Sequence, residues 1–299
     1  MQAMERPLKI SVIIPVFNEE HHIGACLDAL MAQTVPADEI IVVDNNSADD
    51  SVAITTQYSG VKIVSEEQQG LYYARQTGMR VAQGDILCRI DADTQLSPGW
   101  VAAVRQVFAD DAVQAASGPV GYYDFYLPRM WLWLNNFFGR GAILMNYKFL
   151  FGCNMAIRRN AWQVVERELC NKPFLLEDID VTLHLRDHGI DPVYSKHVYG
   201  FVSCRRALDS LPQFWDYMSK HARTMRYHGR PVFAAYYAEC VYMIFYLIFH
   251  PWVVMYNPAT GRLEPSRLWN PVEARPDPMT TGIGLPSTDD SASSRVTTD

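Results

Sequence analysis

The sequence predicts an α/β fold in which a mostly parallel central sheet is covered by helices on both faces. Short apolar runs alternate with segments of helical periodicity from residue 9 to residue 109, and this alternation is typical of a parallel sheet. Polar residues stand where the predicted strands end, which is where such sheets bind their ligands. The chain has 299 residues, 49% of them hydrophobic, so it can bury a substantial core.

The elements of the first half follow one another closely. Continuous apolar runs predict strands over residues 10–16, 40–43, 61–64 and 86–90. The segments between them predict helices that begin near residues 18–20, 49–50 and 70, the last of which is stopped by Gly84. Ser97-Pro98 is typical of an N-cap followed by proline in the first turn, and it predicts a helix to about Ala109.

The pattern changes after residue 118. Aromatic and apolar residues crowd the segment from Tyr122 to Phe151, and residues 209–228 predict a helix that carries several basic side chains. An apolar run from Val232 to Phe249 follows. The tail beyond Pro271 is rich in small and polar residues, so we expect it to be disordered.

Charge and cysteine content exclude several classes of protein. The net charge of -7 argues against a nucleic-acid binder, because affinity for a phosphate backbone depends on clustered Lys and Arg. The 6 cysteines show neither CxxC pairing nor histidine spacing, so neither a zinc site nor a disulfide framework is indicated. Reduced thiols in the cytoplasm are the simplest interpretation. The N-terminus has no apolar stretch of signal-peptide length, so we expect no export.

The most informative stretch reads DILCRIDADT, in which an apolar strand runs into Asp91 and Asp93. Because side chains alternate along a strand, we expect both carboxylates on the same side of the sheet. Two adjacent carboxylates repel each other unless a cation lies between them, and this favours a bound divalent metal. The alternative is a polar turn after an edge strand.

Two more acidic groups are expected at the same edge of the sheet. Asp44 follows the second strand, and Glu177, Asp178 and Asp180 stand at the start of a helix that Gly189 ends. Acidic residues also favour the first turn of a helix because they complement its dipole, so the second group has a purely structural alternative. The joint occurrence of the three groups favours a site.

Five segments carry a family resemblance, in the order SVIIPVFNEE, IIVVDNNSADDS, GLYYARQTGMRVAQGDILCRIDADT, GCNMAIRR and LLEDIDVTLHLRDHG. Spread over residues 9–205, they resemble family 2 glycosyltransferases, which have the nucleotide-sugar-binding, Rossmann-like GT-A fold. The resemblance implies a GT-A catalytic domain over residues 1–208, with a nucleotide-sugar half at 1–118 and an acceptor half at 119–208. A helical region over 209–270 and a disordered tail over 271–299 would follow.

The resemblance also implies roles at the nucleotide. Asp44 would hydrogen-bond the base, Glu19 would reach the ribose, and Arg75 would contact the nucleotide. Asp93 would bind a Mg²⁺ or Mn²⁺ ion that bridges the diphosphate, and Asp91 would contact the nucleoside or share the metal. The other residues expected at the nucleotide are Pro15, Phe17, Asn18 and Asn46.

The same resemblance implies that Asp178 and Glu177 are the catalytic residues, with Asp178 as the general base that removes the proton from an acceptor hydroxyl. A single displacement then inverts the sugar, and no second carboxylate nucleophile is needed. Arg205 and Arg206 would contact the diphosphate or form a solvated basic turn. We also consider His184, His188 and His197 as extra metal ligands, although an unpaired histidine is more often a plain polar residue.

The expected function is therefore metal-dependent transfer from a UDP- or GDP-sugar to a hydroxyl acceptor in cell-envelope glycolipid or polysaccharide synthesis. One alternative is a nucleotide-sugar-binding subunit without catalysis. Another is nucleotidyl transfer to a sugar phosphate, which the first turn, PVFNEE, disfavours because that class usually has a glycine-rich turn there.

The apolar run at Val232 to Phe249 suggests contact with the inner face of the cell membrane. It is borderline in length for a span and contains Glu239, so we favour an interfacial or re-entrant helix. Arg223, Arg226 and Arg230 would then face anionic lipid, and the segment from 122 to 151 would guide a lipid-linked acceptor. The alternative is a buried helix that closes the domain.

Overall fold

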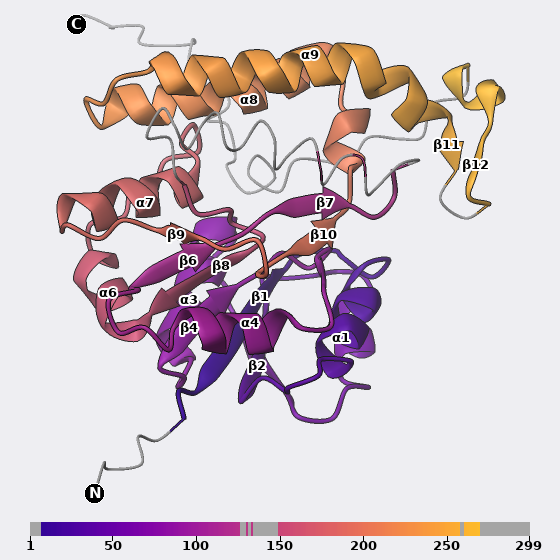
Figure 1. Ribbon diagram of the computed structural model, residues 1–299. Coiled ribbons are helices and arrows are strands. Elements are labelled where there is room, and N and C mark those ends of the chain that lie inside the picture. Colours follow the sequence, from indigo (N-terminus) through magenta and orange to yellow (C-terminus); the bar gives the residue numbers. More distant parts are fainter. Residues whose placement is uncertain (1–6, 126–129, 131–132, 134–148, 258–259, 270–299) are drawn as a thin grey trace, which may run out of the picture.

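The computed structural model describes residues 7–125, 130, 133, 149–257 and 260–269. The tail expected to be disordered lies outside these residues, as does most of the aromatic segment from Tyr122 to Phe151. The described residues form an α/β domain with a layer of two long helices at one end (Figure 1).

The centre of the domain is a seven-stranded sheet with the order β3-β2-β1-β4-β8-β6-β9 (Figure 1). Its first four strands are β3 (Val61–Ser65), β2 (Glu39–Asp44), β1 (Ile10–Val16) and β4 (Ile86–Arg89), all mutually parallel. The others are β8 (Met155–Arg158), β6 (Ala115–Ser117) and β9 (Val193–Tyr194). Within this sheet β8 is reversed, and β6 and β9 restore the original direction. The predicted mostly parallel sheet is confirmed.

Helices cover both faces of this sheet, as expected, because side chains along β1 alternate between two cores. Val12 and Ile14 pack with α1 (Ile23–Met31) and α4 (Trp100–Val107). Ile13 packs with α3 (Leu71–Val81), α6 (Arg159–Val165) and α7 (Glu177–Asp187) on the opposite face. The short helix α2 (Ser51–Thr55) follows β2 near the position predicted for it.

Several helix boundaries differ from the prediction because turns precede the helices. Helix α1 begins at Ile23 rather than near residue 18, since Asn18 has a φ of 53° and Glu19 accepts hydrogen bonds at its carbonyl in a turn. Helix α4 has Gly99 rather than Ser97 as its N-cap, and it ends at Val107. Helix α3 ends at Val81, before Gly84.

A small second sheet joins distant segments beside the central one. It contains β5 (Gln95–Leu96), β10 (Gly200–Val202) and β7 (Val120–Tyr122), with β10 in the middle. Strand β5 follows the acidic stretch after β4, and β10 precedes the two arginines at 205 and 206. This pairing brings Asp93 close to Arg205 in space.

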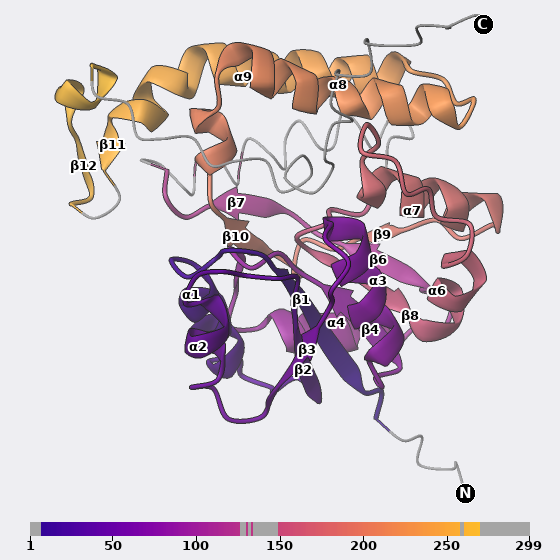
Figure 2. The same cartoon turned by 180° about the vertical axis from the view of Figure 1, so that it is seen from behind.

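The C-terminal helices lie side by side as a separate layer (Figures 1 and 2). A 3-10 turn (Arg205–Leu208) leads into α8 (Leu211–Tyr227), whose N-terminus carries a capping box formed by Ser210 and Gln213. Helix α9 (Phe233–Met255) then runs back across the domain, and β11 (Tyr256–Asn257), β12 (Arg262–Leu263) and a second 3-10 turn (Pro265–Leu268) follow.

Glu239 does not lie on the exposed face of α9. Its side chain packs against α8, where Oε1 accepts a hydrogen bond from the backbone N–H of Ala222 at 2.9 Å, and the residue is only 4% exposed. Burial raises the pKa of this carboxyl group. Glu239 was counted against a membrane span because a charge facing lipid is unfavourable. Since its side chain packs against α8, that free-energy cost does not apply to this residue.

Candidate active site

The carboxyl ends of β1, β2 and β4 open onto a cavity of about 1010 Å³, which extends beneath α8 and α9. The residues that the sequence predicts there and that do line it are Pro15, Phe17, Glu19, Arg75, Asp91, Asp93, Glu177, Asp178, Arg205 and Arg206. Asn18, Asp44 and Asn46 do not line this cavity. The structure thus brings together most of the predicted site from five separate segments.

The three exceptions brace the neighbouring loops. Asn18 accepts a hydrogen bond from the N–H of Ala48 at 2.8 Å, and Asp44 accepts one from Ser47 at 3.1 Å. Asn46 donates to the carbonyl of Glu67 at 2.9 Å. Asn18 and Asn46 have positive φ angles of 53° and 63°, a conformation that asparagine tolerates better than most residues.

Asn45, which lies between Asp44 and Asn46, holds the loop that precedes α3 in place. The side chain is buried, its Nδ2 donates to the carbonyls of Glu66 and Gln68, and its Oδ1 accepts from the N–H of Gly70. An acid at this position would supply no donor for the two carbonyls. Sequence reasoning assigned Asn45 no role, and a buried asparagine can be recognised as a loop brace only once its partners are known.

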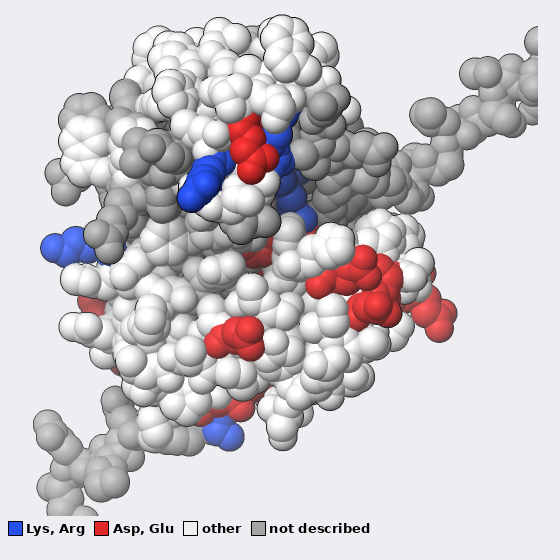
Figure 3. Space-filling model, turned by 90° about the vertical axis from the view of Figure 1, so that its right-hand side faces the viewer, with Lys and Arg blue, Asp and Glu red and all other residues white. Residues whose placement is uncertain are grey.

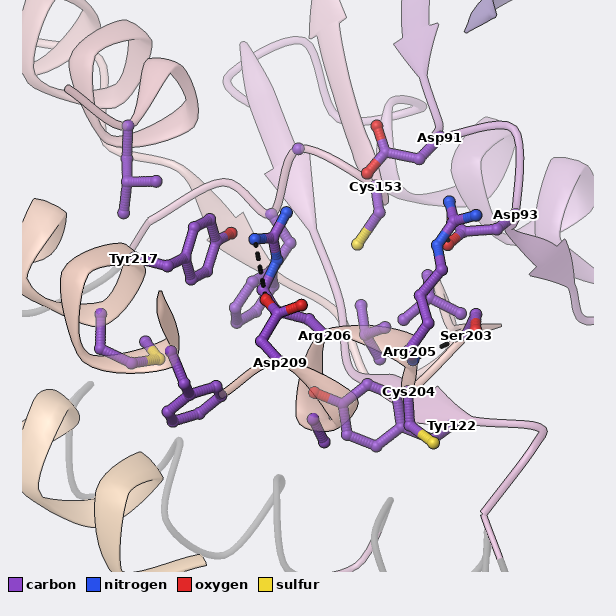
Figure 4. A pocket seen from close by; sticks show the side chains of 18 of the residues that line it. Asp91, Asp93, Tyr122, Cys153, Ser203, Cys204, Arg205, Arg206, Asp209 and Tyr217 are labelled. Atoms are coloured by element: carbon purple, nitrogen blue, oxygen red, sulfur yellow. Dashed lines mark hydrogen bonds and ion pairs between the residues drawn. The ribbon is translucent and has the colours of Figure 1, made fainter. Parts of the chain in front are cut away.

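Asp91 and Asp93 reach the cavity by a route that differs from the prediction. Strand β4 ends at Arg89, and the N–H of Thr94 donates to the carbonyl of Asp91 at 3.0 Å in a tight turn. Strand alternation therefore does not apply, and that part of the prediction was wrong. Both side chains nevertheless lie at the cavity, as Figure 4 shows.

Arg205 supplies a positive charge beside Asp93. Its Nη2 lies 2.9 Å from Oδ2 of Asp93. The same guanidinium also binds both carboxylate oxygens of Glu19, at 2.8 and 2.9 Å. Burial lowers the pKa of Arg205, but Glu19 and Asp93 outweigh this effect and hold the pKa above its usual value.

These contacts change two expectations. Arg205 is bound by carboxylates at the cavity, so the alternative of a solvated basic turn is wrong for this residue. The carboxylate of Glu19 is directed at Arg205, and the residue is 7% exposed, which differs from the expected contact with a ribose. Arg206 instead stacks 3.8 Å from the centre of the Tyr217 ring, and its Nη1 lies 3.7 Å from Asp209 (Figure 4).

Glu177 is held between two arginines. One carboxylate oxygen lies 2.5 Å from Nη1 of Arg75, and the other lies 2.8 Å from Nη1 of Arg89. Nη2 of Arg75 extends the network to Asp91 at 3.4 Å. Since both oxygens of Glu177 are engaged, the geometry favours a positioning role over the catalytic role expected from the sequence.

Sequence reasoning missed Arg89, which is fully buried at 0% exposure. It donates through Nε to the carbonyl of Gly152 at 3.2 Å, and its Nη2 has no hydrogen-bond partner among the described residues. Burial, followed by the nearby charge of Arg75, lowers the pKa of Arg89. The available signal was the arginine inside the apolar run ILCRI, because a buried charge needs a partner.

Asp178 stands in the first turn of α7, at the cavity wall. Its Oδ2 accepts from the N–H of Gly152 at 3.2 Å, and its Oδ1 accepts from the N–H of Ile179 at 3.0 Å. The positive end of the helix dipole also favours an anion at this position. The site therefore holds Asp178 as a fixed carboxylate beside open volume.

The wall opposite Asp178 comes from α8 and α9 and contains residues that the sequence did not indicate. Burial lowers the pKa of His221, whose Nδ1 lies 2.9 Å from the carbonyl of Met218. Tyr217 and Tyr242 also line this wall, and burial raises the pKa of each to about 12. His221 and the two tyrosines are therefore uncharged at neutral pH, and they give this wall an aromatic surface.

A divalent ion fits the ligand chemistry of this site. Asp91 and Asp93 offer carboxylate oxygens at one cavity, and Mg²⁺ and Mn²⁺ prefer oxygen ligands. The histidines considered as extra ligands do not line the cavity. His184 and His188 lie near Glu168 at the far end of α7, so they cannot assist a metal at Asp93.

The doubly covered α/β sheet has one reversed strand and a cavity at its strand ends, and this architecture matches the GT-A class of fold. Residues 11–165 match the family model described as Glycosyl transferase family 2. The chain belongs to this family, which confirms the resemblance identified from the sequence.

The chain is similar to several known proteins. "Glycosyltransferase AglE" of Haloferax volcanii is 36% identical over 120 residues, which is 38% of this chain and 40% of that protein. The mannosyltransferase PcManGT of Pyrobaculum calidifontis, solved with GDP-Man and Mn²⁺, superposes with a TM-score of 0.56 and 18% identity over 93% of this chain and 79% of the other.

A third similar structure is glucosyl-3-phosphoglycerate synthase of Mycobacterium tuberculosis, solved with Mn²⁺, UDP and glucosyl-3-phosphoglycerate. Its TM-score is 0.50 and its identity 19%, over 75% of this chain and 81% of the other. At these identities the structural likeness shows the fold. The matched region spans less than half the length of the curated relatives.

Proposed function

We propose that the protein is a metal-dependent, inverting glycosyltransferase that moves a sugar from a UDP- or GDP-sugar to a hydroxyl acceptor. Family membership supports the reaction class. The observation that carries the proposal is the shared cavity, onto which Asp91, Asp93 and Asp178 all open. Under this proposal residues 1–118 bind the donor, and residues 119–208 together with α8 and α9 bind the acceptor.

Each carboxylate then has a separate role. Asp93, with Asp91, would hold Mg²⁺ or Mn²⁺, which would supply positive charge to the departing nucleoside diphosphate. Asp178, fixed by the N–H of Gly152, accepts the proton of the acceptor hydroxyl as that oxygen attacks the anomeric carbon. Glu177 keeps the two arginines in place, as described above. Arg205 would transfer its contact from Asp93 to the diphosphate.

The acceptor would carry an apolar portion. The part of the cavity beneath the C-terminal helices is lined by Tyr242, Phe245, Phe249 and Val253 of α9. A free sugar offers little apolar surface to such a wall, whereas a lipid-linked acceptor would bury its chain there. We therefore favour a lipid-linked acceptor over a soluble one.

Helix α9 supports placement at a membrane surface. It is 23 residues long, with a mean hydropathy of 1.5 in its most apolar window, of which 22% is buried. Its exposed side chains recur at helical spacing and include Phe233, Tyr236, Ile244, Leu247, Ile248 and Trp252. We call these six residues the α9 stripe. Figure 3 shows that the top of the molecule, where α9 lies in Figure 1, is largely uncharged.

The stripe favours a helix that lies along the inner face of the cell membrane, with its buried side against α8. The basic residues expected to meet anionic lipid already have partners. Arg223 pairs with Asp216 at 2.5 Å, Arg230 pairs with Asp187, and Arg226 donates to the hydroxyl of Tyr236 at 2.7 Å. Membrane attraction would therefore rest mainly on apolar contact.

The decisive experiment measures release of nucleoside diphosphate from a panel of UDP- and GDP-sugars, with and without Mn²⁺ and with a membrane lipid extract as acceptor source. We expect release from one donor that depends on the metal and on the acceptor. Tight donor binding without any release would support a non-catalytic subunit instead. Pyrophosphate release from a nucleoside triphosphate and a sugar phosphate would support nucleotidyl transfer.

A further inference from the structure

A second group of metal-ligating side chains lies away from the cavity. Cys170 precedes α7, Asp180 and His184 stand one turn apart on α7, and His228 caps the C-terminus of α8. One ligand atom from each of these residues lies within 4.8 Å of each of the others. We call these four residues the Cys170 cluster. None of them lines the catalytic cavity.

The distances within the cluster resemble those around a tetrahedral metal. Nε2 of His184 lies 3.9 Å from Sγ of Cys170 and 3.6 Å from Oδ1 of Asp180. Nε2 of His228 lies 2.7 Å from the same Oδ1. Around zinc, with bonds of about 2.0–2.3 Å, tetrahedral ligand atoms are roughly 3.3–3.8 Å apart. Shifts of under about 1 Å at the side chains would complete the geometry.

Neighbouring groups orient two of the ligands. The other ring nitrogen of His184, Nδ1, lies 3.4 Å from Glu168, and this contact leaves Nε2 directed at the cluster. Oδ2 of Asp180 accepts from the N–H of Cys170 at 2.9 Å, so that Oδ1 remains toward the two histidines. Such outer carboxylate and backbone contacts are typical of histidine metal sites.

Burial distinguishes the cluster from a surface group of charges. The side chain of Asp180 is 0% exposed, that of His228 is 10% exposed and that of His184 is 13% exposed. A fully buried carboxylate requires compensation by a cation. Protonated His228 alone could provide it, but that would leave unexplained why a thiol and a second imidazole nitrogen converge on the same point.

We propose that Cys170, Asp180, His184 and His228 bind one structural Zn²⁺. Sulfur and imidazole ligands favour zinc over the Mg²⁺ or Mn²⁺ expected at the oxygen-rich catalytic site. Four protein ligands leave no open position for a substrate. The ion would tie the loop before α7 to α7 and α8, and so stiffen the helix that begins with Glu177 and Asp178.

The spacing of the four residues explains why no zinc motif can be recognised in the sequence. Cys170 has no second cysteine nearby, and His228 lies 44 residues beyond His184, so no compact zinc motif exists. The i, i+4 pair of Asp180 and His184 is the only local trace. Folding of α8 against α7 brings the fourth ligand into place.

The test uses the full chain, purified through a tag without histidines, stripped of metal and titrated with Zn²⁺ or Co²⁺. We expect binding of about one equivalent of Zn²⁺, a rise in melting temperature and, with Co²⁺, the absorption bands of a tetrahedral site including a thiolate charge-transfer band. Cys170→Ser should abolish that charge-transfer band. Cys240→Ser, which changes an exposed thiol on α9, should retain it.

Two further variants separate this site from the catalytic one. His184→Ala should weaken Zn²⁺ binding at least about tenfold, whereas Asp93→Asn should leave it unchanged. Failure of the wild-type chain to bind zinc near one equivalent, or a charge-transfer band that survives Cys170→Ser, would overturn the proposal. The wild-type titration decides even where a variant does not fold. No donor sugar is involved, so the outcome is independent of the proposed transferase activity.

Discussion

At the scale of single residues, the carboxylates of the cavity differ in the groups that neutralise them. Asp93 and Glu19 share Arg205, and Glu177 binds both Arg75 and Arg89. Asp178 instead accepts hydrogen bonds from the backbone N–H groups of Gly152 and Ile179, and within the described part of the chain it forms no direct ion pair. A carboxylate without a direct ion pair to a guanidinium is better placed to accept a proton than one that has both oxygens paired. This difference separates Asp178 from its neighbour Glu177.

Asp178→Asn should therefore reduce turnover by about 10²- to 10⁴-fold, because an amide cannot act as the base. Donor affinity should change little, since Asn retains the acceptor oxygen for Gly152. Steady-state turnover and nucleotide binding by calorimetry would be measured on the same preparation. The matched control is Asp209→Asn. The wild-type carboxylate of Asp209 also lies on the cavity wall, beside Arg206. Wild-type turnover in Asp178→Asn would remove it from the role of base.

Glu177→Gln should destabilise the fold by about 3–5 kcal/mol, because it leaves the buried charge of Arg89 without a carboxylate. Urea denaturation gives the free energy of unfolding. The double variant Glu177→Gln with Arg89→Met should recover part of the loss, since it also removes the uncompensated charge. Equal stability of wild type and the single variant would show that the network is not stabilising.

At the scale of elements, the sequence predicted the helices and strands that are encoded by local sequence patterns. The strands β1 to β4 and the helices between them were predictable because apolar runs and helical periodicity are encoded within a few residues. Helix ends were less predictable. Ser97-Pro98 predicted the start of α4, but the helix begins later, at Trp100, with Gly99 as its N-cap. The partners of Arg89 and of Asn45 lie far away in sequence or in loops, so no local pattern could reveal them.

The α9 stripe should govern membrane association. The double variant Ile244→Asp with Leu247→Asp should lower binding to liposomes of bacterial lipid by at least about tenfold, because each change removes exposed apolar contact. Flotation with full-length protein measures the bound fraction. Val164→Asp changes a comparably exposed apolar residue on α6 and should leave flotation unchanged. Absence of flotation by the wild-type chain would refute the membrane placement.

At the scale of the whole molecule, two sets of long-range contacts bring the residues of the site together. The small sheet β5-β10-β7 brings the arginine segment to the ends of the parallel strands, and α8 and α9 close the cavity from above (Figure 1). Neither contact has a signal within a short window of sequence, because each joins segments that are far apart in the chain, such as Gly200 with Leu96 and Phe249 with Phe125. The family resemblance identified the residues of the site, and the structure identifies which of them are in contact.

The contact between Arg205 and Asp93 has a consequence for the resting enzyme. Because Arg205 already lies between Asp93 and Glu19, part of the repulsion among these carboxylates is relieved without a divalent ion. If the proposed catalytic ion is removed, transfer should stop with little change in melting temperature, and any loss of thermal stability on chelation should come from the proposed zinc site at the Cys170 cluster. Under the two proposals, transferase activity and thermal stability would depend on two different metal ions, an exchangeable ion at Asp93 and a structural ion at the Cys170 cluster.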